Sequence, residues 1–294
     1  MRVCVLLAAL LAAAATVLAH SASTAAPTDL PLDWRDLAQA AGMAAQAYCD
    51  NVRTGDVVGD AEVLWHKFIG VIKQRVVVFH SERLGVAVAF EGTQPYVVPR
   101  LHDVNVRLAP PKGWLADVLP ADIQIHAGFQ NAYLQVAQDM VAAVKDAVAV
   151  HNATRVTCTG HSLGAALGVL AGAHLDRLLD ADVQVYTFGT PRIGDEAWAD
   201  YIDSRLAGRF FYVANGRDWV PHAPPTQLGY WHPSGQIWIS PANSDQWRFF
   251  PGQENVHGAE SETPKISFED HTGVHFHTYI GLDRQSCPAR VNDM

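Results

Sequence analysis

Apolar residues recur along the first part of the chain with two different spacings, which predict a helix followed by paired strands. Helical spacing of Leu and Ala predicts a helix over residues 32–48. Two Val-rich runs, residues 75–80 and 84–90, are separated by three polar residues and predict two strands that pair in a sheet. Residues 94–124 contain five prolines and no clear period, so we expect a long loop there.

The second half of the chain alternates strands with helices. Helical spacing over residues 132–150 precedes a short apolar strand at 155–159 and a helix rich in Ala and Leu at 165–179. Residues 183–188 and 209–214 predict two more strands, each of which runs into a loop that contains Gly. Strands that alternate with helices form α/β sheets, whose sites lie at the carboxyl ends of the strands. We therefore predict an α/β fold with its site at that edge.

The motif Gly160-His161-Ser162-Leu163-Gly164 lies between the predicted strand at 155–159 and the helix that follows. A serine on such a sharp turn has a strained backbone, and its hydroxyl stands clear of the sheet. Residues without a side chain, two before and two after the serine, let strand and helix pass closely. Both glycines are present, so Ser162 is the candidate nucleophile.

A serine hydroxyl is a weak nucleophile at neutral pH, so Ser162 needs a histidine base and an acid that orients the base. In hydrolases with this motif, the acid and then the histidine follow the serine along the chain. Asp218 comes soon after the predicted strand at 209–214 and is our choice for the acid. The alternatives, which lie on or beside a predicted helix, are Asp195, Asp200 and Asp203.

The base must lie still later in the chain. Beyond residue 250 the candidates are His257, His271, His275 and His277. His257 lies in a polar stretch without predicted structure, which leaves the dipeptide Asp270-His271 and the pair His275 and His277. His161 is excluded as the base, because neighbouring side chains on so tight a turn point apart.

Composition and the first residues predict an exported protein. The chain has 294 residues, of which 49% are hydrophobic and 17% charged, as expected for one domain with a large core. Residues 1–19 contain an apolar run after Arg2 and small residues at Val17 and Ala19, which predicts a cleaved signal peptide rather than a membrane anchor. The mature chain, residues 20–294, would be a single secreted domain with 20 basic and 30 acidic residues. Nucleic acid and anionic membranes are therefore not expected partners.

Three cysteines remain after cleavage, so at least one is unpaired. Cys158 lies in the apolar strand before the turn and should be a buried free thiol. By elimination, Cys49 and Cys287 should form a disulfide. The sequon Asn152-Ala153-Thr154 lies between a predicted helix and a strand, so Asn152 is a candidate glycosylation site.

Five sequence blocks together resemble the fungal class 3 lipases, secreted α/β-hydrolases related to the Rhizomucor enzyme. The blocks are 88–93 (Val-Ala-Phe-Glu-Gly-Thr), 126–129 (His-Ala-Gly-Phe), 159–164 (Thr-Gly-His-Ser-Leu-Gly), 186–194 (Tyr-Thr-Phe-Gly-Thr-Pro-Arg-Ile-Gly) and 218–221 (Asp-Trp-Val-Pro). The resemblance extends from about residue 75 to the C-terminus. It implies an α/β-hydrolase fold with a mostly parallel central sheet, flanking helices and a lid-like insertion, and it implies no cofactor.

The resemblance also assigns roles to residues. It gives Ser162 and Asp218 the roles of nucleophile and acid. Thr93 matches the residue whose backbone N–H and side chain stabilise the oxyanion, and the N–H of Leu163 would be the second donor. This chain departs from the family at Glu91, where the family usually has Arg, so the partner of that Arg must be rearranged.

The resemblance favours His271 as the base but leaves rivals. The family has an Asp-His pair, then two or three intervening residues, then an aromatic residue. Asp270-His271 fits that block, with His275 at the position of the aromatic residue. A second alignment places His277 at the base, because its distance to Cys287 also resembles the family. His271 is therefore our assignment, with His277 and then His275 as alternatives.

Residues 94–124 follow the oxyanion position, where the family places its lid. Their apolar residues fall in two groups: Leu101, Val104, Val106 and Leu108, and then Trp114, Leu115, Val118 and Leu119. We expect part of this stretch to cover the active site. The alternative is that these side chains simply pack on the domain.

The function predicted from the sequence is a secreted serine carboxylic-ester hydrolase, a triacylglycerol lipase that works through an acyl-enzyme. We expect a monomer that acts on glycerides or other esters at a lipid–water interface, without a stable membrane anchor. A feruloyl or other short-chain esterase of the same fold is the alternative. Two other classes are further alternatives: a zinc site formed by His271, His275 and His277, and a non-catalytic lipid or glycan binder.

Overall fold

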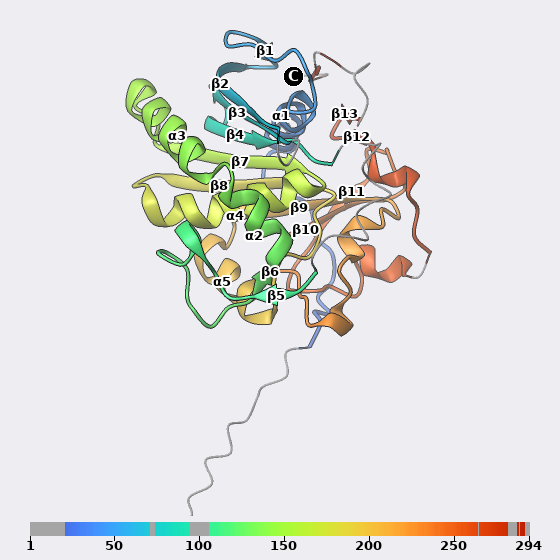
Figure 1. The fold of residues 1–294 in the computed structure, drawn as a ribbon. Helices are drawn as coiled ribbons and strands as arrows, with labels where there is room; N and C mark the ends of the chain where they lie inside the picture. The colour runs from blue at the N-terminus through green and yellow to red at the C-terminus, as the bar shows by residue number, and fades with distance from the viewer. Residues whose placement is uncertain are drawn as a thin grey trace, which may run out of the picture.

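The structure is a computed structural model that describes residues 21–70, 74–93, 106–263, 265–281, 287 and 289–291. The expected signal peptide, residues 1–19, lies outside these ranges. A nine-stranded sheet forms the centre of the described part, with helices on both sides (Figure 1). No helix within these ranges has the length and apolar character needed to cross a bilayer.

The sheet has the strand order β1-β2-β3-β4-β7-β8-β9-β10-β11. Its strands are β1 (Val57–Val58), β2 (Ala61–Ile69), β3 (Gln74–Ser81), β4 (Gly85–Phe90), β7 (Arg155–His161), β8 (Asp182–Phe188), β9 (Phe210–Asn215), β10 (Gln236–Ile239) and β11 (Trp247–Phe250). The five central strands, β4 and β7 to β10, are parallel, and the strands at both edges are antiparallel. The sheet is therefore mixed, with its parallel part in the middle.

The sheet separates the core into two layers, each of which is covered by helices. The helices are α1 (Trp34–Gln46), α2 (Ala127–Leu134), α3 (Ala137–His151), α4 (Leu163–Leu178) and α5 (Glu196–Leu206). On one face, α1 and the hairpin of β12 (Gly273–His275) and β13 (Thr278–Ile280) share a buried cluster with the sheet. The other helices share the second buried cluster, on the opposite face. A small antiparallel pair, β5 (Leu108–Ala109) and β6 (Ile125–His126), lies beside α2.

Glycines let α4 lie close on the sheet. A Cβ atom on Gly168 would lie 3.0 Å from the carbonyl oxygen of Thr159 in β7. One on Gly172 would lie 2.3 Å from a methyl carbon of Val185 in β8. A side chain at Gly168 would push the helix away from β7, and one at Gly172 would push it away from β8.

Two expectations from the pattern need correction. The helix expected over 132–150 is two helices, because α2 ends at Leu134 and α3 begins at Ala137. In the loop after residue 93, Leu115 and Leu119 are buried in the core cluster that contains α2 to α5. These two leucines pack on the domain and do not support a cover that exposes them on opening, whereas Trp114 in the same half is 48% exposed. Leu101 and Val104 lie outside the described residues.

Candidate active site

The turn between β7 and α4 holds Ser162 in the strained conformation expected for a nucleophile. Ser162 has φ 59° and ψ −128°, a backbone conformation that residues with side chains rarely adopt. The flanking glycines are sterically required, because a Cβ atom on Gly160 would lie 2.2 Å from the carbonyl oxygen of Gly164. One on Gly164 would lie 2.1 Å from that of Phe90. The sequence adopts this turn because these two positions lack side chains.

His271 and Asp218 form a buried pair at the carboxyl ends of the strands. Nδ1 of His271 lies 3.0 Å from both carboxylate oxygens of Asp218. The side chains are 7% and 1% exposed, so little water competes for this contact. The N–H of Val220 also donates to Asp218, at 2.9 Å. With the carboxylate fixed on Nδ1, the proton of a neutral ring stays there and Nε2 is left as the base.

Hydrogen bonds between side chains and backbone fix the loops of Asp218 and His271 to each other. The side-chain amide of Asn215, the last residue of β9, donates to the carbonyl oxygen of Asp270 at 3.0 Å. In return, the Asp270 carboxylate accepts from the N–H of Arg217 at 2.7 Å. Gly189, at φ 53°, leaves room for the base, because a Cβ there would lie 3.0 Å from the ring of His271. Asp270 is thus a structural partner of the loop, a role that the sequence did not reveal.

The rival histidines have other partners. His277 lies 3.6 Å from the carboxylate of Asp245, and its ring contacts Trp34 and Trp247. His275 is buried, with Nδ1 at 3.2 Å from the carbonyl oxygen of Gly273. The three histidines considered for zinc therefore do not converge. Within the described ranges, no group of three or more His, Cys, Asp or Glu side chains is placed to hold a metal ion.

The acids that competed with Asp218 lie on the helix side of the fold. Asp195 caps α5 by accepting from the N–H of Trp198 at 2.9 Å. Asp200 lies on α5, and Asp203 accepts from both the N–H and the hydroxyl of Ser234. Of the acids considered, only Asp218 contacts His271.

Two groups beside Ser162 are suited to stabilising an oxyanion. Thr93 follows β4 and is buried, and its hydroxyl has no hydrogen-bond partner among the described residues. Leu163 is the first residue of α4, where backbone N–H groups have no acceptor within the helix. Both expected donors thus lie at the edge of the sheet where β4 and β7 end side by side.

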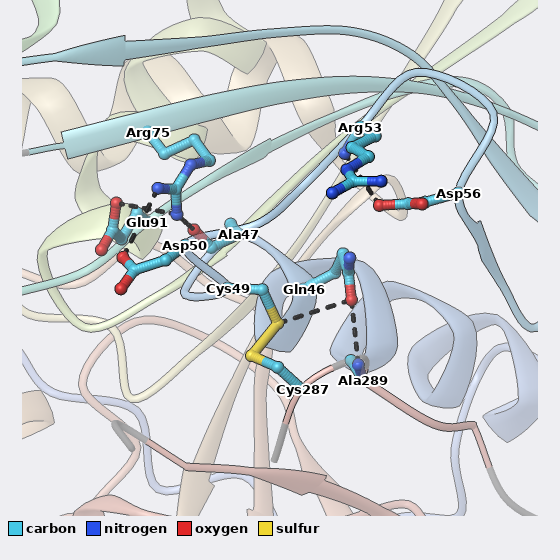
Figure 2. Close-up of a disulfide and its surroundings, with 10 residues drawn as sticks. All are labelled: Gln46, Ala47, Cys49, Asp50, Arg53, Asp56, Arg75, Glu91, Cys287 and Ala289. Atoms are coloured by element: carbon cyan, nitrogen blue, oxygen red, sulfur yellow. Dashed lines mark hydrogen bonds and ion pairs between the residues drawn. A yellow bond between two sulfur atoms is a disulfide. The ribbon is translucent and has the colours of Figure 1, made fainter. Parts of the chain in front are cut away.

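Glu91, the departure from the family pattern, is balanced by an arginine from the neighbouring strand. Arg75 of β3 lies 3.7 Å from the Glu91 carboxylate, and both side chains are buried. Figure 2 shows Arg75 reaching from Glu91 to the end of α1, where it donates to the carbonyl oxygen of Ala47 at 3.0 Å. This contact ties the strand end before Thr93 to α1.

The disulfide lies at the same end of α1. Cys49 and Cys287 are bonded across 238 residues of chain (Figure 2). Gln46 reinforces this tie, because its side-chain oxygen accepts from the N–H of Ala289 at 2.9 Å. Cys158 is a buried free cysteine, and burial raises the pKa of its thiol above the working range. The bond connects the first helix to the C-terminal segment.

Aromatic and apolar side chains form an exposed rim next to the base. Trp219 follows Asp218, and its ring centroid lies 6.3 Å from that of His271. Phe268 packs against Trp219 with centroids 5.3 Å apart but remains 68% exposed, and Ile266 is 47% exposed. Large apolar side chains that stay exposed side by side mark a candidate surface for an apolar ligand.

Sequence relatives place this arrangement in a family. Residues 87–228 match the family Lipase (class 3). The secreted mono- and diacylglycerol lipase LIP4 of Malassezia restricta is 49% identical over 267 residues, which cover 90% of this chain and 89% of that protein. The chain belongs to the class 3 lipases. The secreted mono- and diacylglycerol lipase MDL2 of Malassezia globosa is 41% identical to this lipase and covers 92% of it, with 90% of its own length aligned.

Solved structures agree with this assignment. Lipase II from Rhizopus niveus has a TM-score of 0.72 and 27% identity to this class 3 lipase, covering 85% of it and 96% of the Rhizopus chain. A lipase from Rhizopus microsporus var. chinensis has a TM-score of 0.74 and 27% identity, over 87% of this chain and 92% of its own. The predicted α/β-hydrolase fold and the predicted enzyme class, a carboxylic-ester hydrolase, are confirmed.

Proposed function

We propose that this lipase hydrolyses acylglycerols through an acyl-enzyme on Ser162, with His271 as the base and Asp218 as the acid. The observation that carries this proposal is the buried His271–Asp218 contact at 3.0 Å, at the edge of the sheet where the strained Ser162 turn lies. Ser162 Oγ attacks the ester carbonyl while His271 takes its proton and later delivers it to the leaving alcohol. Water then attacks the acyl-enzyme with the same base and releases the fatty acid.

The negative charge of the tetrahedral intermediate falls on the carbonyl oxygen of the ester. The backbone N–H groups of Thr93 and Leu163, with the Thr93 hydroxyl, are the proposed donors to that oxygen. Losing one such donor costs about 10²-fold to 10³-fold in kcat in serine hydrolases. The Thr93 hydroxyl fits this role because it has no other partner among the described residues.

Partial glycerides are among the proposed substrates. The two Malassezia relatives, at 49% and 41% identity, are named mono- and diacylglycerol lipases. The sequence predicts a triacylglycerol lipase. Its substrate has the same ester bond as mono- and diacylglycerols but carries three acyl chains. The exposed rim of Phe268 and Ile266 supports binding at a lipid surface, since contact with lipid removes apolar area from water at about 25 cal/mol per Å².

One substrate series tests the reaction class and the glyceride class together. Trioleoyl-, dioleoyl- and monooleoylglycerol should be hydrolysed in matched emulsions, with methyl ferulate in parallel and the Ser162→Ala variant as the background. We expect diacylglycerol to be hydrolysed at least as fast as triacylglycerol. Preference for the ferulate would establish the short-chain esterase instead, and activity in Ser162→Ala would remove the nucleophile assignment.

We also propose that the protein is a secreted, monomeric single domain that carries a glycan on Asn152. The relatives are named secreted lipases. Asn152 is exposed at the end of α3, and Thr154 of its sequon is exposed as well. A mass shift on deglycosylation that is lost in Asn152→Gln would support the site. An identical mass before and after treatment, in protein secreted by a glycosylating host, would contradict it.

A further inference from the structure

His161 is buried between two polar partners that the proposed reaction does not use. Its Nε2 lies 2.7 Å from the backbone carbonyl oxygen of His271. Its Nδ1 lies 3.0 Å from the hydroxyl of Tyr48, which follows α1. All of the side chain is out of contact with water. His161, the residue before Ser162, therefore contacts the backbone of His271 rather than the serine.

These two contacts fix which nitrogen of His161 carries the proton. A carbonyl oxygen only accepts, so Nε2 must be the protonated nitrogen that donates to His271. Burial, together with the neighbouring His271 and His275, lowers the pKa of His161 well below its usual value, so the ring is neutral. Nδ1 of a neutral ring is then an acceptor, and the Tyr48 hydroxyl must donate to it.

We propose that His161 and Tyr48 are positioning residues, which hold the base His271 through its own backbone carbonyl. The rings of His161 and His271 also pack against each other, with centroids 4.5 Å apart. The contact therefore restrains the backbone of His271 at one point and its ring at another. This proposal rests on the assignment of His271 as the base.

Tyr48 also contacts the strand end that leads to the oxyanion position. A Cβ atom on Gly92 would lie 1.9 Å from the Tyr48 hydroxyl and 2.5 Å from the carbonyl oxygen of His161. Only glycine allows this approach, so Tyr48 packs directly on the residue before Thr93. Burial, and then the Glu91 carboxylate, raise the pKa of Tyr48 well above its usual value, so the phenol remains a donor at any working pH.

A second tyrosine–histidine pair in the same protein provides a matched control. The Tyr133 hydroxyl lies 2.8 Å from Nδ1 of His174, and both residues are buried. The ring arrangement is the same, edge to face, with centroids 5.9 Å apart against 6.0 Å for Tyr48 and His161. His174 is twelve residues along α4 from Ser162, which is about 18 Å at 1.5 Å per residue. This pair therefore has the same chemistry without contact with the site.

The test compares Tyr48→Phe with Tyr133→Phe on a soluble substrate, 4-nitrophenyl butyrate. Each variant removes one buried hydroxyl from a histidine Nδ1, so both should lower the melting temperature to a similar extent. Only Tyr48→Phe should lower kcat, by about 10-fold to 100-fold, because a small displacement of a reacting group costs that much. KM should stay within a factor of two in both variants.

A proton resonance gives a readout that a loss of stability alone would not change. The proton between His271 Nδ1 and Asp218 should appear at low field in the wild type and shift in Tyr48→Phe, with no change in Tyr133→Phe. Equal kcat values for the two variants, with an unchanged resonance, would overturn the proposal. If Tyr48→Phe does not fold, His161→Asn against His174→Asn provides the same comparison. Full activity in His271→Ala would instead overturn the proposed function, which keeps the two failures distinct.

Discussion

Two buried carboxylates lie at the carboxyl ends of neighbouring strands, and they differ in the basic side chain that each one faces. After β9, Asp218 faces His271. After β8, Arg192 binds both oxygens of Glu254, at 2.6 and 2.8 Å, and also contacts Glu260. The carboxylates Asp218 and Glu254 are almost fully buried, with 1% and 4% of the side chain exposed.

The difference between the pairs is whether the basic side chain can accept a proton. A neutral imidazole has a free ring nitrogen that can accept one, whereas a guanidinium stays charged and only donates. Arg192 also donates to the carbonyl oxygens of His222 and Pro224, at 2.8 and 3.1 Å, soon after Asp218 in the chain. Arg192 therefore holds the loop that carries Asp218, and the contact of Asp218 with His271 is the one proposed to serve catalysis. The two carboxylates are alike in burial and in charge, so these two properties alone do not show which pair has a catalytic role.

The largest expected effect is on activity, from neutralising the carboxylate that faces the histidine. Asp218→Asn should lower kcat by about 10⁴-fold, because an amide nitrogen facing Nδ1 favours the wrong tautomer of His271. Glu254→Gln neutralises a carboxylate that is equally buried and should leave kcat within a few-fold. Both variants would be assayed with 4-nitrophenyl butyrate at equal folded concentration. Equal losses of kcat would show that the two pairs are not functionally different.

The next effect is on stability, from removing the permanent cation. Arg192→Met leaves the buried Glu254 without its partner, and breaking a buried pair in this way costs about 3 to 5 kcal/mol. The double variant Arg192→Met with Glu254→Gln should recover part of that loss, because the most deeply buried charge, on Glu254, is then removed as well. Urea unfolding of both would measure the free energies. A double variant that is less stable than the single one would contradict the account.

A smaller effect is expected from pH, through Glu260, which contacts Arg192 together with Glu254. Burial opposes ionisation of Glu260, but a hydrogen bond with His222 and the charge of Arg192 outweigh it and lower its pKa to about 2. A carboxyl group whose pKa is lower in the folded state contributes stability above its unfolded pKa, which is about 4.3. That stability is lost as the pH falls from there toward 2. The melting temperatures of wild type and Glu260→Gln should therefore differ at pH 6, and the gap should narrow as the pH falls below about 4.3 and close near pH 2. A gap that stays constant over this range would refute the linkage.

Local sequence patterns predicted the strands, turn and helix that carry the candidate site residues Ser162 and Asp218. The turn at Ser162 needs a strand, a helix and two glycines within a few residues, and all of them are visible in sequence. The strand that leads toward Asp218 is a continuous apolar run because it is buried on both faces. Elements at the edges of the sheet gave no such signal: β2 is exposed along much of its length, and β10 and β11 have four residues each.

Contacts between distant parts of the chain could not be predicted. Tyr48 and His161 are separated by 113 positions, and no property of either residue indicates the other. The apolar spacing also hid the break between α2 and α3, because Tyr133, Val136 and Met140 continue one buried stripe across it. Leu115 and Leu119 were expected to belong to a cover, but they are buried in the core. Apolar residues in a proline-rich loop can pack in a core as well as form a lid, so their pattern does not distinguish the two.

The smallest effect is expected at His277 and Asp245, the exposed counterpart of the proposed catalytic pair. His277 lies 3.6 Å from Asp245, but the aspartate side chain is 71% exposed, and exposed ion pairs contribute about 0 to 1 kcal/mol. His277→Ala should keep full activity, whereas His271→Ala should lose about as much as Ser162→Ala. The replacement should cost a little stability, because the ring contacts Trp34 and Trp247. The three variants would be compared by organophosphate labelling and by thermal melting. Loss of labelling in His277→Ala alone would move the base to His277 and remove Asp218 as its partner, since Asp218 contacts His271 and not His277 in the structure.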